Sequence, residues 1–268
     1  METYAPAPPE PVTPIIVADG LAQRFGTRTI FRDVSFQVMP NEIFVILGGS
    51  GCGKSTLMRQ LIGLLPPTSG HIRLHGQVIT GPDAIGARDA MRQGIGVMFQ
   101  SGALFGSMSL LENVMLPLEV FTDLPPSARA AMARVKLALV GLADAASLMP
   151  AEISGGMARR AGIARAMAMD PPLLFLDEPS AGLDPITSAG LDRLILALRR
   201  DLGATFVVVT HELASIMAVA DRCIMLDRAA FPDAGGLIAE GDPRHLRDES
   251  VLPTVRAFFR REPLEAGR

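Results

Sequence analysis

The stretch "IFVILGGSGCGKST", residues 43–56, decides the fold. Residues 43–47 are all apolar, which is typical of a strand that is buried on both faces. Glycines then occupy four of the next six positions, and Lys54 opens a segment that we expect to be helical. A strand, a glycine-rich loop and a helix in this order predict a phosphate-binding loop in an α/β protein.

The loop carries the residue types that bind a nucleoside triphosphate. Gly48, Gly53, Lys54 and Ser55 satisfy the pattern G-x-x-x-x-G-K-[ST]. Backbone N–H groups can close around phosphate oxygens, Lys54 can reach the β- and γ-phosphates, and the Ser55 hydroxyl can ligate Mg²⁺. ATP and Mg²⁺ are therefore expected, and the loop residues expected to bind them are Gly48, Gly49, Ser50, Gly51, Cys52, Gly53, Lys54, Ser55 and Thr56. The alternative is a glycine turn with an incidental lysine.

Further apolar runs predict a parallel sheet. Strands are expected at "LLFL" (173–176), "TFVVVT" (205–210) and "CIMLD" (223–227). Between the first two, leucines and an isoleucine recur at helical spacing from 191 to 202, with Gly203 as the expected end of that helix. Strands that alternate with helices favour a parallel sheet, which binds its ligand at the carboxyl ends of its strands.

Polar residues follow several of these strands. Asp177 can hold Mg²⁺ directly or through water, and Glu178 can act as the general base that polarises a water for attack on the γ-phosphate. His211 can hydrogen-bond the γ-phosphate or that water, and the amide of Gln100, after "IGVMF", can contact magnesium or water. The expected catalytic residues are thus Lys54, Gln100, Glu178 and His211, and the expected metal ligands are Ser55, Gln100 and Asp177. Taken singly, each also reads as an ordinary turn, loop or structural residue.

A second glycine pair occurs in "ISGGMARR", residues 153–160, at the expected start of a helix. Ser154 is a good helix cap, yet Gly155 and Gly156 each cost roughly 1 kcal/mol against alanine. Such glycines are useful where a helix N-terminus must press its N–H groups onto an anion. Because the chain already has a phosphate loop, this second anion site implies the nucleotide of another copy and a dimer closed by ATP.

Composition limits the remaining classes of protein. The chain has 268 residues, a net charge of −3 and a pI near 5.8, which gives no broad basic field for nucleic acid. No apolar run is long enough to span a bilayer, and two isolated cysteines suit the cytosol. We expect a disordered proline-rich tail over residues 1–14, an ATPase domain over 15–243 with a helical insert at about 102–170, and a C-terminal extension over 244–268.

The motifs together resemble the nucleotide-binding subunit of ABC transporters, over about residues 15–243. The resemblance rests on residues 48–56, Gln100, "ISGGM", "LLFLDEPSAGLD" and His211. It implies a P-loop NTPase fold: a RecA-like core with a mainly parallel sheet, an N-terminal antiparallel β subdomain and an inserted α-helical subdomain. It also implies that Ser154, Gly155 and Gly156 bind ATP in trans, that Asp184 is the D-loop acid at the dimer seam, and that Phe25 stacks on adenine.

A finer resemblance rests on "FQSGALF", "SGGMARR" and "DEPSAGLDPIT". These are similar to the ATPases of MCE-type phospholipid transport systems, the Mla family, although Ile153 and Met157 depart from the commonest "LSGGQ". The implied complex contains two ATPases, a dimeric MlaE-like permease, an MCE substrate-binding protein and often a small STAS-domain subunit, with no nucleic acid. The implied function is phospholipid transport that maintains outer-membrane lipid asymmetry or serves MCE-type lipid trafficking, with the ATPase on the cytoplasmic face of the inner membrane.

Several alternatives stay open at this point. The segment "SGALFGSMSLLENV" (101–114) either receives a coupling helix from the permease or contributes core residues, and Phe258 and Phe259 either anchor a neighbouring subunit or pack on their own domain. An importer of a polar solute such as an amino acid would share every catalytic residue. A soluble phosphotransferase would not need "ISGGM", and an ABC-type ATPase of DNA repair or translation usually carries a coiled coil or a second cassette.

Overall fold

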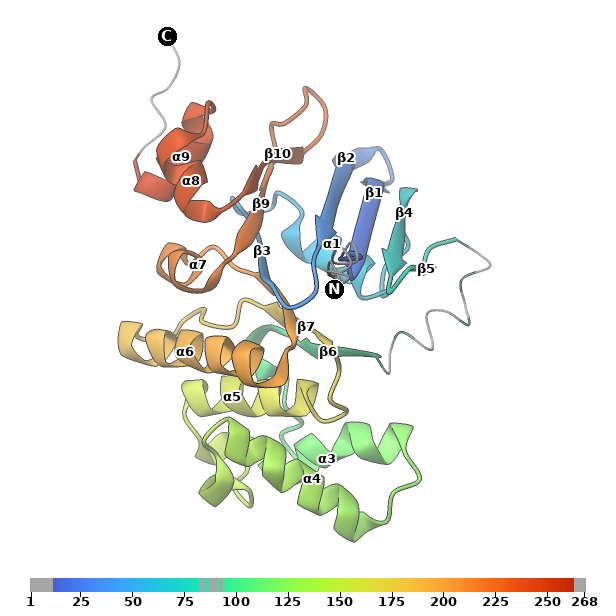
Figure 1. Ribbon diagram of the computed structural model, residues 1–268, viewed down its shortest axis with the longest axis vertical. Coiled ribbons are helices and arrows are strands. Elements are labelled where there is room, and N and C mark those ends of the chain that lie inside the picture. Colours follow the sequence, from blue (N-terminus) through green and yellow to red (C-terminus); the bar gives the residue numbers. More distant parts are fainter. Residues whose placement is uncertain (1–11, 82–83, 85, 87–90, 92–93, 263–268) are drawn as a thin grey trace, which may run out of the picture.

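The computed structural model describes residues 12–81, 84, 86, 91 and 94–262. The expected N-terminal tail therefore lies mostly outside the described residues. The described part contains two sheets, one helix between them, and a group of helices on the opposite side of the larger sheet (Figure 1).

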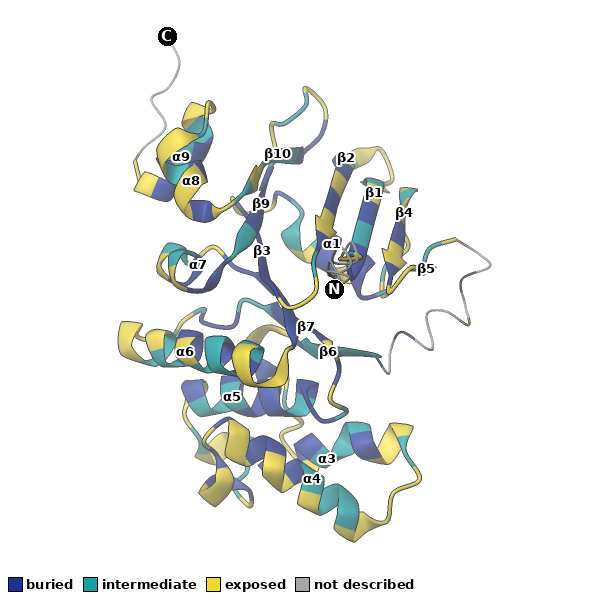
Figure 2. Ribbon diagram, in the orientation of Figure 1, coloured by how far each residue is buried: buried dark blue, intermediate teal, exposed yellow. Residues whose placement is uncertain are grey.

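The larger sheet has six strands in the order β10-β9-β3-β8-β7-β6. Its strands are β3 (Ile43–Gly48), β6 (Ile95–Met98), β7 (Leu173–Asp177), β8 (Thr205–Val209), β9 (Arg222–Asp227) and β10 (Gly236–Gly241). All neighbours are parallel except the antiparallel edge pair β9 and β10, which the sequence did not indicate. The central strands are buried along most of their length (Figure 2), as their unbroken apolar runs predict.

The smaller sheet is entirely antiparallel, in the order β2-β1-β4-β5. Its strands are β1 (Ile16–Phe25), β2 (Arg28–Val38), β4 (Ser69–Leu74) and β5 (Gln77–Val78). The helix that follows the phosphate loop, α1 (Lys54–Leu61), buries Leu57 and Leu61 in one apolar cluster with residues of both sheets. This cluster fixes the phosphate loop between the sheets.

The helical insert lies between β6 and β7 in the chain and below the sheets in Figure 1. It contains α3 (Leu110–Phe121), α4 (Pro126–Leu139), α5 (Gly155–Ala166) and the short 3₁₀ turns η2 (Gln100–Gly102), η3 (Ala143–Ala145) and η4 (Pro150–Glu152). Helix α3 lies within the helical insert expected at about 102–170, although no separate helix was expected at its position. Its residues Leu110, Val114 and Leu118 are fully buried, so this part of the segment contributes core, whereas Phe105 before it is exposed.

The remaining helices are α6 (Pro185–Leu202), α7 (Leu213–Val219), α8 (Pro243–Glu249) and α9 (Pro253–Arg260). Helix α6 ends at Gly203, which adopts the left-handed conformation with φ of 64°, as the sequence predicts. In α9, Phe259 is 3% exposed within the main core cluster and Phe258 packs against that cluster. These two rings therefore pack on their own domain.

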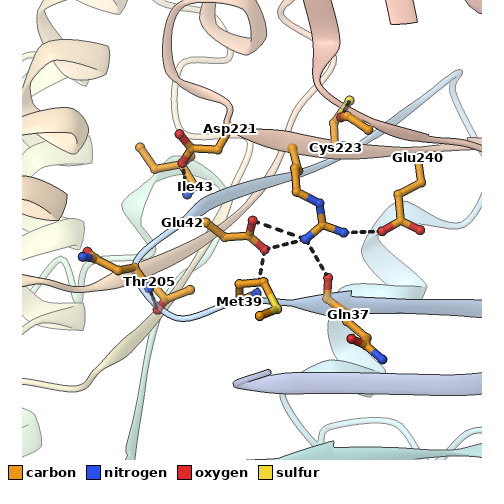
Figure 3. A network of polar contacts seen from close by, with 11 residues as sticks. Gln37, Met39, Glu42, Ile43, Thr205, Asp221, Cys223 and Glu240 are labelled. Carbon is orange, nitrogen blue, oxygen red and sulfur yellow. Dashed lines mark hydrogen bonds and ion pairs between the residues drawn. The ribbon is translucent and has the colours of Figure 1, made fainter. Parts of the chain in front are cut away.

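A network around Arg222 ties the strands together at the end of β9 away from Leu226, which pairs with Gly48 at the start of the phosphate loop. Figure 3 shows the network with its partners Gln37, Glu42 and Glu240 labelled. The guanidinium of Arg222 donates to both carboxylate oxygens of Glu42 at 3.1 and 3.3 Å, to the carbonyl of Gln37 at 3.3 Å, and to Glu240. Glu42 also accepts from the Met39 N–H at 2.7 Å. One arginine thus joins β2, β9, β10 and the turn before β3, which stabilises the sheet without taking part in the site.

Candidate nucleotide-binding site

The phosphate loop connects β3 to α1 through backbone conformations that glycine provides. Gly48 has φ of +146° and Gly53 has φ of +105°. A Cβ on Gly53 would lie 2.7 Å from Cδ1 of Phe31, and one on Gly48 would collide with the carbonyl oxygen of Leu226. Any other residue at either position would force the loop away from the strands that hold it.

Lys54 lies over this loop. Its Nζ donates to the carbonyl oxygens of Gly48 at 2.9 Å and Gly49 at 3.1 Å. Helix α1 begins at Lys54 after Gly53, and no side chain caps its first turn among the described residues. The loop therefore presents a cation together with uncapped N–H groups, which is the arrangement that binds phosphate.

The two acids expected to serve hydrolysis lie at the end of β7. Asp177 pairs with Val209 of β8, and the next residue, Glu178, donates its N–H to the Val209 carbonyl at 2.8 Å. Glu178 has φ of +47°, a conformation uncommon for a residue with a side chain and often found at functional sites. Its Oε1 lies 2.9 Å from Nδ1 of His211, so the structure brings the expected base and histidine into contact.

Two carboxylate oxygens at the end of β7 are buried without a hydrogen-bond partner among the described residues. They are Oδ1 of Asp177 and Oε2 of Glu178. Burial raises the pKa of Asp177, the neighbouring Glu178 raises it further, and Arg59 and Lys54 oppose this. Buried acceptors without donors fit a site that receives a cation and a water.

The oxygen atoms at this edge that could ligate a metal suit Mg²⁺ bound together with a nucleotide. Among the described residues, no cluster of three or more His, Cys, Asp or Glu can hold a metal by itself. A hard cation here would therefore need Asp177, the exposed hydroxyl of Ser55 and phosphate oxygens. Gln100, at the start of η2, is exposed and follows β6, whose Met98 pairs with Leu176, so it lies at the same carboxyl edge.

The second glycine pair begins α5. Ser154 is its N-cap, with Oγ accepting from the Met157 N–H at 3.3 Å. Gly155 is exposed, as the access of an anion requires, but Gly156 is buried. A Cβ on Gly156 would lie 2.5 Å from Cγ2 of Thr187 in α6, so its lack of a side chain serves packing within the chain. The sequence explanation of both glycines by one anion missed this contact.

The last two expected site residues lie on separate elements. Asp184 is the N-cap of α6; its carboxylate accepts from the N–H groups of Ile186 and Thr187, both at 3.0 Å, and from the Thr187 hydroxyl. That hydroxyl holds the pKa of Asp184 below its usual value. Phe25, at the end of β1, is 50% exposed, which leaves its ring open to a planar ligand.

The structure thus divides the expected residues into two groups. The phosphate loop, Asp177, Glu178 and His211 meet at the carboxyl edge of the large sheet, around β3, β7 and β8. Ser154, Gly155, Gly156 and Asp184 lie at the starts of α5 and α6, in a different part of the molecule from α1 (Figure 1).

Residues 31–181 match the family model described as "ABC transporter". The chain belongs to the ABC transporter family. It is an ATP-binding subunit of this family and an ATPase, and the expected P-loop NTPase fold is confirmed.

Named relatives place this ABC ATPase more finely. It is 43% identical over 223 residues to the "intermembrane phospholipid transport system ATP-binding protein MlaF" of Escherichia coli K12, covering 82% of both chains. It is 40% identical over 248 residues to the "probable ribonucleotide transport ATP-binding protein mkl" of Mycobacterium tuberculosis, covering 91% of this chain and 66% of that protein. The chain thus spans about two thirds of the length of that relative. The resemblance to Mla-type ATPases is confirmed.

A solved structure is also similar to this ABC ATPase. It is a dimeric ATP-binding cassette in a post-hydrolysis state bound to ADP and Pi, with a TM-score of 0.74 and 27% identity, covering 85% of this chain and 98% of that one. Proteins of this family therefore dimerise and hydrolyse ATP. Within the described residues, no helix combines the length and the apolar character needed to cross a membrane.

Proposed function

We propose that this ABC ATPase drives phospholipid movement through a membrane permease, as part of an MCE-type system that maintains lipid asymmetry or traffics lipid. The observation that carries this is the 43% identity to MlaF over 82% of both chains. The proposed partners are a second copy of the chain, an MlaE-like permease, an MCE substrate-binding protein and a small STAS-domain subunit. Through the permease, the chain would sit on the cytoplasmic face of the inner membrane.

The proposed chemistry uses the groups at the carboxyl edge. The loop of residues 48–56 and Lys54 bind the phosphates of ATP, and Phe25 stacks on adenine. Oε2 of Glu178, which has no partner among the described residues, accepts a proton as water oxygen bonds to the γ-phosphorus. The bond from that phosphorus to the β,γ-bridging oxygen breaks, and ADP leaves with the electron pair. His211 holds the other oxygen of Glu178 in place.

Mg²⁺ would be held by Ser55, Asp177 and Gln100 together with phosphate oxygens, and when bound it neutralises phosphate charge. Asp177 suits this role because its Oδ1 is buried without a partner among the described residues. The positive charge would also favour the ionised form of a carboxyl whose pKa burial raises.

We propose that ATP hydrolysis at each site depends on a second copy of the chain. Ser154 and Gly155 are exposed at the start of α5, a helix N-terminus that is not part of the chain's own phosphate site. We place this N-terminus on the γ-phosphate bound by the partner copy, where its N–H groups and dipole would stabilise the anion. Hydrolysis would then remove the anion and release the two copies.

The permease would dock on an apolar pocket beside this machinery. The pocket has a volume of about 290 Å³ and lies between β6 and the helical insert, with Phe99, Pro117, Phe121 and Arg165 among its lining residues. Phe99 and Phe121 are exposed, as is Phe105 nearby in the chain. This surface adjoins Gln100. A movement of the catalytic edge would therefore displace a permease helix bound here.

One experiment tests the substrate. The tagged chain is purified with its membrane partners, and the co-purifying proteins and small molecules are identified by mass spectrometry. We expect a permease, an MCE protein and bound phospholipid. The name of the mkl relative favours a second candidate, import of a polar solute such as a ribonucleotide. A soluble solute-binding protein in place of the MCE protein, with no lipid retained, would establish that candidate instead.

A further inference from the structure

The start of α5 is packed directly against the loop and helix that follow β7. Gly156 meets Cγ2 of Thr187, and a Cβ built on Gly155 would lie 3.6 Å from Cδ2 of Leu183. Helices α5 and α6 lie side by side along this contact (Figure 1). The two elements expected to face the partner copy, the signature segment (residues 153–157) and the D-loop (residues 180–184), are thus in contact within one chain.

Arg159 strengthens this contact one turn further along α5. It is 8% exposed, and its Nη2 donates to the carbonyl oxygen of Ala181 at 3.0 Å. Its Nη1 is buried without a hydrogen-bond partner among the described residues, and burial lowers the pKa of the guanidinium. Burying a cation with an unpartnered nitrogen costs free energy, so local stability alone does not account for an arginine at this position.

The same loop residue also touches the catalytic base. The N–H of Ala181 donates to the backbone carbonyl of Glu178 at 3.3 Å. A short chain of contacts therefore runs from Arg159 on the signature helix, through Ala181, to the backbone of Glu178. In the proposed dimer, Arg159 lies on the helix that binds the partner's nucleotide. Glu178, at the other end of these contacts, acts on the nucleotide bound by its own chain.

We propose that Arg159 is a positioning residue that, with the contact between Gly156 and Thr187, holds the signature segment and the D-loop as one block and couples the two nucleotide sites of the dimer. This inference rests on the proposed dimer with ATP bound in trans. Binding of the partner's ATP at the start of α5 then restrains the loop that carries Glu178. Coupling of this kind is a free energy between sites and appears as cooperativity in ATP.

The first test removes the Arg159 donor. In Arg159→Met we expect kcat and the ATP affinity of dimerisation to fall about tenfold each, as the loss of a charge-assisted hydrogen bond predicts. We also expect the Hill coefficient for ATP to move towards 1, while a single chain binds a fluorescent ADP analogue within about twofold of wild type. Arg159→Lys, which keeps a cationic N–H donor on a shorter reach, should recover part of each loss. Arg193→Met, an exposed arginine of α6, is the matched control.

The second test uses the methyl group of Thr187. Gly156→Ala should weaken dimerisation and turnover because the new Cβ meets Cγ2. Thr187→Ser removes that methyl and keeps the hydroxyl that donates to Asp184, so Gly156→Ala with Thr187→Ser should recover activity. Thr187→Val, which keeps the methyl shape and removes the hydroxyl, should not rescue. Thermal melting of every variant identifies losses that come from unfolding.

Dimerisation is measured by sedimentation velocity with ATP in the Glu178→Gln background, and turnover with Glu178 intact. If the Glu178→Gln chain dimerises but Arg159→Met changes neither dimerisation nor the Hill coefficient, the inference is overturned and the proposed dimer stands. The inference also fails if Arg159→Met lowers the melting temperature and weakens ADP binding as strongly as it lowers kcat, because the loss of activity would then come from unfolding. It fails as well if Thr187→Ser does not restore the activity of Gly156→Ala. If no dimer forms with ATP, both the proposed dimer and this inference fall.

Discussion

Replacement of Glu178 by glutamine tests the catalytic assignment at the scale of single atoms. The side chain is 15% exposed, its Oε1 contacts Nδ1 of His211 at 2.9 Å, and its Oε2 has no partner among the described residues. Glutamine has the same shape and can still hydrogen-bond the histidine, but it cannot take a proton from water. We expect kcat to fall about 10²- to 10⁴-fold, which corresponds to about 2.7–5.4 kcal/mol in the activation barrier.

The assay separates chemistry from binding. Phosphate release gives kcat, and titration with a fluorescent nucleotide gives affinity, which should stay near that of wild type because Lys54 and its contacts with the loop are unchanged. Glu212→Gln, which removes one carboxylate directly after His211, is the matched control and should hydrolyse ATP normally. Wild-type turnover by Glu178→Gln would remove Glu178 from the mechanism and refute the assignment of its free oxygen.

Three other variants examine the trans site, the C-terminal helix and a buried acid. Gly155→Glu should abolish turnover and leave nucleotide binding to the same chain's loop intact, because Gly155 is exposed at the proposed trans site; normal turnover would exclude that site. Phe259→Ala should lower the free energy of unfolding by about 3 kcal/mol, measured by urea denaturation, because the ring is in the core; an unchanged value with weakened dimerisation would assign it to a subunit contact. Burial raises the pKa of Asp192, so its ionised form costs stability above that pKa; the melting temperature of Asp192→Asn relative to wild type should be highest at pH 8 and decline as the pH falls, and the opposite trend would contradict this.

The candidate catalytic edge was predictable because it depends on local patterns and one topological rule. Each of the central buried strands contains an unbroken apolar run, such as residues 43–47 or 206–209, and the residues after it must meet at the carboxyl edge if the strands are parallel. The placement of Glu178 and His211 at one edge of the sheet follows from that rule. Their 2.9 Å separation does not, because it depends on a positive φ at Glu178 that no sequence pattern announces.

Several features of the structure were not predicted from the sequence, for identifiable reasons. Helix α3 has a signal that could have revealed it: Ser109 and Glu112 form a capping box, in which each side chain accepts from the other's backbone N–H. Strand β10 is only partly buried and pairs antiparallel at the sheet edge, so its apolar pattern is weak. The contacts of Arg159 with Ala181 and of Gly156 with Thr187 join residues 22 and 31 positions apart (181 − 159 and 187 − 156), which periodicity along one helix cannot show.

In the proposed dimer, the two glycines of the signature segment serve two different purposes, ligand binding and close packing of helices. Each costs roughly 1 kcal/mol of helix stability, so each needs its own compensation. Gly155 is exposed, and in the proposed dimer its compensation comes from the nucleotide of the partner copy; Gly156 is buried, and close packing on Thr187 compensates it within the chain. The neighbours that depart from the commonest motif, Ile153 and Met157, are partly buried against the core, where apolar side chains pack well. A substitution at 155 should therefore spare the fold and act on the dimer, whereas one at 156 should act on the dimer through the chain's own D-loop.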